Sequence, residues 1–171
     1  MSQLPADFIT QITQLLGADE ASALCTALTG SEAPVSIRRN PLKPVETLPE
    51  AEVGAVPWCD AGCYLAARPR FTYDPLLHAG CYYVQEAASM FVEQAYRRIV
   101  ADFQPHRLLD LCAAPGGKST LWRSLLPAEH LLVANEPIRQ RAQILAENLA
   151  KWGHPDTCLL YTSPSPRDGA T

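Results

Sequence analysis

The first thirty residues contain apolar positions at helical spacing. The spacing is kept by four side chains: Leu4, Phe8, Ile12 and Leu15. Gly17 interrupts the pattern, and a second helix is expected over residues 20–28, before Gly30. Because each helix has one apolar face, we expect both faces to be buried in a core.

Residues 34–75 are rich in proline, which fixes φ and removes a backbone hydrogen-bond donor. Long helices are therefore excluded from this region. Residues 34–38 and 63–66 have an extended character, so we expect short strands joined by loops.

The pattern changes after residue 85. An apolar stripe over residues 86–100 predicts an amphipathic helix, followed by a connector. The elements expected next are a strand at 107–112, a helix at about 117–126, a strand at 131–134 and a helix at 138–152 before Gly153. This alternation is typical of a parallel, doubly wound sheet. We therefore predict an α/β fold, with the start of a Rossmann-like domain in residues 103–157 and a smaller α+β domain in residues 1–102.

The composition is that of a globular protein, with 47% apolar and 19% charged residues. No apolar run approaches the roughly 18 residues that a membrane span needs, and the amino terminus lacks the features of a secretory signal. Cytoplasmic localisation is therefore expected. The net charge of −4 argues against nucleic-acid binding through overall positive charge, but it permits local basic clusters.

The six cysteines show no obvious disulfide framework. Cys59, Cys63, His78 and Cys81 could in composition bind zinc, but they lack a tight Cys-x-x-Cys knuckle. Buried or half-buried thiols in a reducing compartment are the simpler interpretation. We expect no metal site.

The stretch LLDLCAAPGGKST, residues 108–120, joins the predicted strand to the predicted helix. A triphosphate-binding loop would need glycine at position 112, which is Cys112, and the glycines do not have dinucleotide-binding spacing either. What remains is a tight turn of small residues before a helix whose first N–H groups can receive a carboxylate. Glu136 follows the second strand and could accept the hydroxyls of a ribose. S-adenosylmethionine fits this combination, while a turn and a capping acid without a ligand remain the alternative.

Residues 110–120, DLCAAPGGKST, resemble the first cofactor motif of the Sun-type RNA cytosine-5 methyltransferases. Three further blocks resemble segments of that family, at residues 34–43 (PVSIRRNPLK), 82–90 (YYVQEAASM) and 133–141 (VANEPIRQR). The resemblance extends over residues 1–157 and is strongest to bacterial ribosomal-RNA enzymes of the RsmF type.

The resemblance implies S-adenosylmethionine as the cofactor. The residues implied to bind it are Cys112, Ala113, Ala114, Pro115, Gly116, Gly117, Lys118 and Glu136. Asp110 is expected beneath the turn as its organiser. For Lys118 a solvated position at the helix start is the alternative, and for Arg141 a surface position is favoured over the pocket.

The family's reaction needs a cysteine thiolate that adds to carbon six of cytosine, and a second cysteine that helps to release the base. By the resemblance both lie on later strands, and their segments do not occur here. Cys112 belongs to the first motif and is not the implied nucleophile. Residues 158–171 resemble the translation of a sequencing adapter, with an ordinary Ser/Pro-rich tail as the alternative. We expect residues 158–171 to be non-native and the catalytic domain to end after two strands, which would leave the chain inactive.

The favoured interpretation is the amino-terminal part of an enzyme that methylates carbon five of cytosine in RNA, expected to be ribosomal RNA. A non-catalytic RNA-binding or assembly module with a vestigial nucleotide pocket is the alternative. Phosphate contacts are expected from five cations, with a solvated charged face as the other explanation: Arg38, Arg39, Lys43, Arg68 and Arg70. Trp58, Tyr64 and Phe71 offer stacking surfaces. We expect a monomer that binds neither DNA nor membranes.

Overall fold

The computed structural model describes residues 4–30 and 33–161, and the chain forms two compact units, Met1–Pro34 and Val35–Thr171. The first unit contains α1 (Ala6–Leu16) and α2 (Ala18–Gly30), which contact each other across Gly17. Within this unit, α1 has no buried residue and the Leu15 side chain is 76% exposed, so α2 alone does not bury the apolar face of α1. No helix within the described ranges has the length and apolar character that crossing a bilayer requires.

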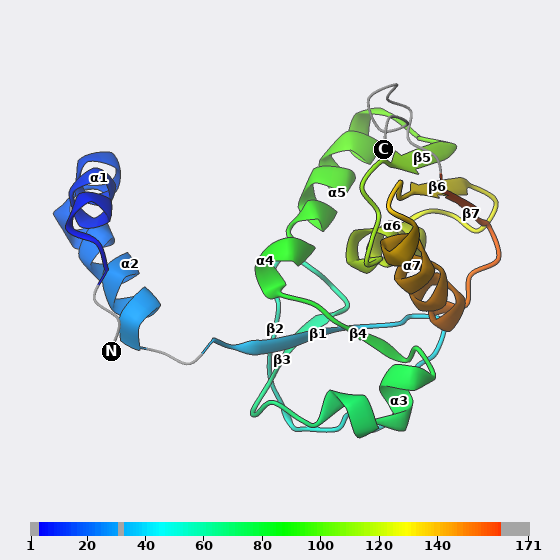
Figure 1. Ribbon diagram of the computed structural model, residues 1–171, viewed down its shortest axis with the longest axis horizontal. Coiled ribbons are helices and arrows are strands. Elements are labelled where there is room, and N and C mark those ends of the chain that lie inside the picture. Colours follow the sequence, from blue (N-terminus) through cyan, green and yellow to red (C-terminus); the bar gives the residue numbers. More distant parts are fainter. Residues whose placement is uncertain (1–3, 31–32, 162–171) are drawn as a thin grey trace. The chain divides into compact units, whose positions relative to one another are not determined.

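The second unit begins with a four-stranded antiparallel sheet (Figure 1). Its strands are β1 (Val35–Arg39), β2 (Glu52–Ala55), β3 (Gly62–Leu65) and β4 (Tyr82–Val84), in the order β2-β3-β1-β4. A 3-10 turn, η1 (Phe71–Tyr73), and α3 (Pro75–His78) connect β3 to β4. Ile37 on β1 lies opposite Cys63 on β3 and Val84 on β4. Short strands with loops were predicted here, but β2 and β4 were not located individually.

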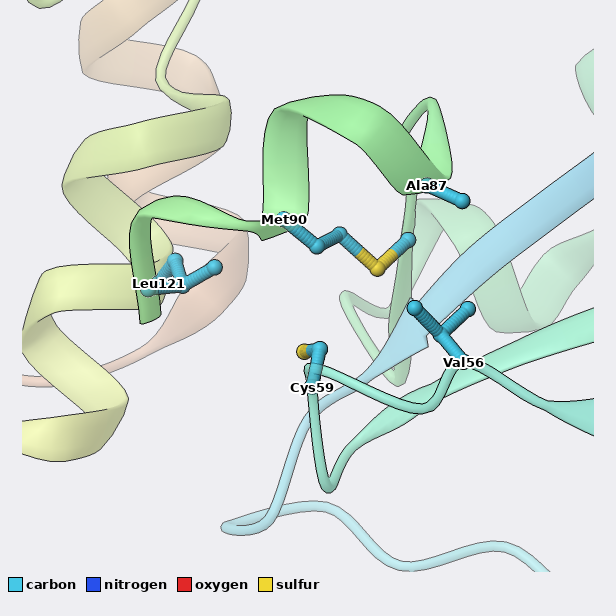
Figure 2. Close-up of a cluster of buried hydrophobic side chains, with 5 residues drawn as sticks. All are labelled: Val56, Cys59, Ala87, Met90 and Leu121. Atoms are coloured by element: carbon cyan, nitrogen blue, oxygen red, sulfur yellow. The ribbon is translucent and has the colours of Figure 1, made fainter. Parts of the chain in front are cut away.

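The single helix predicted over residues 86–100 is divided into α4 (Ala87–Met90) and α5 (Val92–Asp102). The division falls at Phe91, whose N–H donates to the carbonyl of Ala88 three residues back instead of four. α4 contributes Ala87 and Met90 to a cluster of buried side chains that also contains Leu121, from the later helix at Gly117–Leu125, and so joins the antiparallel sheet to that helix (Figure 2). Gly62 must be small at this point, because a Cβ there would lie 2.7 Å from the sulfur of Met90.

The parallel sheet that follows confirms the predicted alternation. Its elements are β5 (Arg107–Asp110), α6 (Gly117–Leu125), β6 (Leu131–Asn135), α7 (Arg139–Trp152) and β7 (Thr157–Leu160), with strand order β5-β6-β7. The sheet therefore has one strand more than expected. Residues 158–160 pair in parallel with β6, because backbone hydrogen bonding needs no particular side chains and Leu159 packs on the apolar cluster beneath. Residues 162–171 of the proposed tail lie outside the described residues.

The change from antiparallel to parallel sheet occurs between β4 and β5, which brackets the boundary expected near residue 103. The two sheets nevertheless belong to one compact unit, whereas the division of the chain falls after Pro34. One reason is Asn40, which lies after β1. Its side-chain nitrogen donates to the carbonyls of Gly80 and Trp152, both at 2.8 Å, and so binds the ends of α3 and α7 together. We call Asn40, Lys43, Gly80 and Trp152 the α3–α7 joint.

Candidate cofactor site

The glycine turn leaves β5 at Asp110 and enters α6 at Gly117. Ala113 and Ala114 are buried in a small cluster with side chains of β6 and α7. Gly116 has φ +112, a conformation that favours glycine, and a Cβ there would lie 3.3 Å from Leu145 Cδ1. Small residues are therefore required both by the backbone conformation and by the close approach of α7.

Asp110 organises the turn, as predicted. Its Oδ1 accepts the backbone N–H of Cys112 at 3.3 Å, and its Oδ2 accepts the hydroxyl of Ser119 at 2.7 Å. Ser119 lies in the first turn of α6, where a carboxylate is stabilised by the positive end of the helix dipole. One side chain thus connects the end of the strand, the turn and the start of the helix.

A surface pocket of about 230 Å³ lies where the turn meets the segment after β4. We call it the cofactor pocket, after the ligand expected there from the sequence. One wall is formed by Tyr83, Val84, Gln85, Glu86 and Ser89, and the other by Cys112, Ala113, Ala114, Pro115, Gly117 and Lys118. The first wall was not assigned to the site from the sequence. Its residues lie within the block at 82–90, which was noted only for its resemblance to a family segment. Lys118 is exposed to solvent and also lines the pocket, so the structure is compatible with both expectations for this residue.

Glu136 follows β6 and is 1% exposed, but it does not line the cofactor pocket. One carboxylate oxygen accepts the N–H of Ile138 at 3.1 Å, and the other lies 3.6 Å from Arg141 Nη2. The same Arg141 nitrogen donates to the carbonyl of Ala114 at 3.1 Å. Arg141 is half exposed, as expected for a surface arginine, yet it also connects the acid to the turn.

The turn and the end of β6 are held together by two further hydrogen bonds. Asn135 accepts the N–H of Ala113 at 3.0 Å with its carbonyl, and its side chain donates to the carbonyl of Leu111 at 3.2 Å. The two motif segments therefore meet at the carboxyl ends of neighbouring parallel strands, where ligands bind in open α/β sheets. Gly117 and Lys118 present the start of α6 to the pocket, an arrangement that favours an anionic group.

Two of the five expected phosphate-binding cations are used inside the protein. Arg38 is 1% exposed, because its guanidinium is enclosed between β1, α6 and α7, so a surface role for it is wrong. Lys43 donates to the carbonyls of Ala79 and Lys151 at 2.8 and 2.7 Å, and so belongs to the α3–α7 joint. A cation near the carboxyl ends of two helices is stabilised by both dipoles.

The other three cations are on the surface. Arg39 pairs with Glu52, the Arg68 guanidinium lies 5.7 Å from the centroid of the Phe71 ring, and Arg70 is exposed. The aromatic side chains expected to stack on bases are packed on the clusters beneath, because Trp58 and Tyr64 contact the Figure 2 cluster and Phe71 contacts the core of the antiparallel sheet.

Cys59, Cys63 and Cys81 are buried free thiols. Burial, together with a hydrogen bond to the Glu93 carboxyl, raises the pKa of the Cys59 thiol to about 12. Such a thiol is not a nucleophile near neutral pH. Cys112 is exposed and lines the cofactor pocket.

Comparisons with known proteins agree with this arrangement. A family model described as the N-terminal domain of the 16S rRNA methyltransferase RsmF matches residues 4–87. A second, described as 16S rRNA methyltransferase RsmB/F, matches residues 99–165 and so includes β7 and part of the proposed tail.

Two relatives are named ribosomal RNA small subunit methyltransferase F. The protein of Shewanella woodyi is 30% identical over 170 residues, which are 94% of this chain and 36% of the relative. That of Vibrio atlanticus is 33% identical over 162 residues, which are 88% of this chain and 33% of the relative. The chain therefore spans about a third of the length of these relatives.

Among solved structures, a methyltransferase homologue from Pyrococcus horikoshii is 25% identical, with a TM-score of 0.74, covering 94% of this chain and 53% of that one. NSun6 from Pyrococcus horikoshii with SFG has a TM-score of 0.70 at 14% identity, covering 93% and 65%, and shows the fold alone. Because the two family models follow each other in chain order and together match most residues, the chain belongs to the RsmB/F family of 16S rRNA methyltransferases.

Proposed function

We propose that this chain carries the S-adenosylmethionine site of an enzyme that methylates carbon five of cytosine in ribosomal RNA. The observation that carries the proposal is the cofactor pocket, in which the glycine turn faces the segment at residues 83–89. Membership of the RsmB/F family supports the reaction class, and the position at the carboxyl end of β5 supports a nucleotide-like ligand.

The residues present fit this cofactor. Gly117 and Lys118, at the start of α6, would hold the carboxylate of its methionine part. Ala113 and Ala114 leave the backbone accessible to the ligand. Glu136 lies outside the pocket and is 1% exposed, so it would accept ribose hydroxyls, with the lone pairs left beyond Ile138 and Arg141, only after the ligand uncovers it. When bound, the cofactor supplies a methyl group on a positively charged sulfur.

We assign the nucleophilic cysteine to the part of the relatives' sequences that this chain does not cover. Attack on carbon six needs a thiolate near neutral pH, and the raised pKa of Cys59 excludes it from that role. Cys112 belongs to the cofactor turn and is not proposed as the attacking thiol. We therefore expect the 171-residue chain to transfer no methyl group by itself.

The proposal is tested by titrating the full-length protein that contains this chain with S-adenosylmethionine in a calorimeter. Glu136→Ala removes the acceptor for two ribose hydroxyls, so a roughly ten- to hundredfold loss of affinity is expected. The matched control is Glu147→Ala, which removes an exposed glutamate from the outside of α7 and should leave affinity unchanged. RNA binding without any heat from S-adenosylmethionine would favour a non-catalytic module and end the proposal.

RNA contact is proposed for the three surface cations, Arg39, Arg68 and Arg70. Replacing each with glutamine removes a positive charge without changing the buried packing. If each neutralises one phosphate, the slope of log affinity against log salt concentration should decrease by about one per substitution. An unchanged slope, measured by filter binding on ribosomal RNA over a range of salt, would remove that residue from the interface.

A further inference from the structure

Arg38 is a buried cation near the end of β1. Burial lowers its pKa to about 10, so the guanidinium is still protonated near neutral pH. Its hydrogen-bond partners are neutral groups, and its Nη1 makes no hydrogen bond to any of the described residues. Because a buried charge is costly unless its surroundings are arranged for it, the contacts of this side chain are informative.

These contacts join the two walls of the cofactor pocket. On one wall, Arg38 Nε donates to the side-chain oxygen of Gln85 at 2.9 Å. On the other, Arg38 Nη2 donates to the carbonyl of Gly117 at 3.2 Å and to the hydroxyl of Thr120 at 2.6 Å. Gln85 and Gly117 both line the pocket, whereas Arg38 does not. The guanidinium therefore bridges the walls from behind the ligand space.

The plane of the guanidinium is itself held in place. Its central carbon lies 4.5 Å from the centroid of the Trp152 ring, on α7. The backbone carbonyl of Gln85 accepts the hydroxyl of Ser36 at 2.7 Å, which fixes that wall to β1 as well. A lysine could keep the charge but not the fork that reaches both walls, since its ammonium is a single point donor group.

We infer that Arg38 is a positioning residue that sets the separation of the two cofactor-pocket walls. It acts through Gln85 and through the first turn of α6, and it does not touch the ligand. The inference rests on the proposed function, because the ligand whose affinity it controls is taken to be S-adenosylmethionine.

The test compares two buried arginines at opposite ends of α6: Arg38 contacts the first turn of the helix, and Arg123 lies in its last turn. Arg38→Met and Arg38→Lys remove the bridge between the walls. Arg123→Met is the control, because Arg123 is equally buried but donates to the carbonyls of Leu126, Pro127, His130 and Asp156, none of which lines the pocket. Urea unfolding gives the stability of each variant, and calorimetry with S-adenosylmethionine, at a temperature where all are folded, gives its affinity.

We expect Arg38→Met to bind S-adenosylmethionine at least tenfold more weakly than the wild type. The affinity of Arg38→Lys should lie between that of Arg38→Met and that of the wild type. Arg123→Met should lose stability yet bind within twofold of the wild type. A purely structural role for Arg38 predicts the opposite, namely equal affinity in all folded variants. Absence of binding by the wild type would refute the proposed function and is thereby distinguishable from failure of this inference.

Thr120→Val provides a milder variant if Arg38→Met does not fold. It keeps the shape of the side chain and removes one of the hydrogen bonds that Arg38 makes. The affinity should fall about threefold, and the effects of Thr120→Val and Arg38→Lys should be less than additive because both break the same contact. The inference is overturned if wild-type protein binds and neither Thr120→Val nor Arg38→Lys changes affinity more than twofold, or if Arg123→Met weakens binding as much as Arg38→Lys does.

Discussion

Replacing Asn40 with leucine removes the hydrogen bonds that hold the α3–α7 joint. The side chain is 1% exposed, and its nitrogen donates to the buried carbonyls of Gly80 and Trp152. Its oxygen accepts the N–H of Leu42 at 3.0 Å, a contact near the surface that water can replace. Leucine has a similar size but leaves the two carbonyls without a donor.

The expected cost follows from these two carbonyls. An unsatisfied buried polar group costs about 1–3 kcal/mol, so the free energy of unfolding should fall by roughly 2–6 kcal/mol. Asn40→Asp is a stricter test, because it keeps the acceptor for Leu42 and places a carboxylate opposite two carbonyl oxygens. Burial and this repulsion act to raise the pKa of the new carboxyl above its usual value of about 3.9, and we expect them to outweigh the attraction of the Lys43 ammonium in the same joint. The folded state then binds the proton more tightly, so the deficit relative to wild type should shrink as the pH falls below that raised pKa.

Urea unfolding followed by tryptophan fluorescence measures both effects, since Trp152 lies in the joint. The measurement is made at pH 7.5 and pH 5 on wild type, Asn40→Leu and Asn40→Asp. A loss below about 1 kcal/mol for Asn40→Leu would refute the reasoning that Asn40 satisfies two buried carbonyls. A deficit for Asn40→Asp that grows on acidification would contradict the assigned hydrogen-bond directions.

Three further predictions concern one glycine and the thiols. Gly80 has φ +72, and a Cβ there would lie 1.9 Å from the carbonyl oxygen of Lys151, so Gly80→Ala should cost at least about 2 kcal/mol in urea unfolding. Gly54→Ala, at a position with open space around it, is the control and should cost less than about 1 kcal/mol. Because burial raises the pKa of Cys59 to about 12 from 9.0, the unfolded state loses this proton first, and stability should fall as the pH rises above 9. Maleimide at pH 8 should modify Cys112 and should not modify Cys59 until urea is added. Mass spectrometry after digestion identifies the modified cysteines. Modification of Cys59 before urea is added would contradict its burial.

The parallel sheet was predictable because its signals are local. The helix at 138–152 is marked by apolar spacing and by Gly153, and the structure begins it one residue later. The turn at 111–117 was predictable from its small residues and from the acid at position 110. The break at Phe91 has no such signal, since the apolar stripe continues through it and the division depends on how α4 packs over the Figure 2 cluster.

The position of Arg38 shows what local patterns could not supply. Beside Arg39 and Lys43 it looks like part of a basic surface, because charged residues are usually exposed. Its partners Gln85, Thr120 and Trp152 lie 47 or more positions away, so its burial is a property of the assembled unit. The wall at residues 83–89, which was not assigned to the site from the sequence, has the same origin, because residues 83–89 and 112–118 are brought together only in the assembled unit.

Since the pocket takes one side from each sheet, neither sheet alone can enclose a ligand. Occupancy and the mutual docking of the sheets are consequently linked equilibria, and a ligand at one hundred times its dissociation constant would add about 2.7 kcal/mol to the stability of the second unit. The same linkage means that a substitution far from the pocket weakens ligand binding only if it destabilises the docking enough to populate the undocked form.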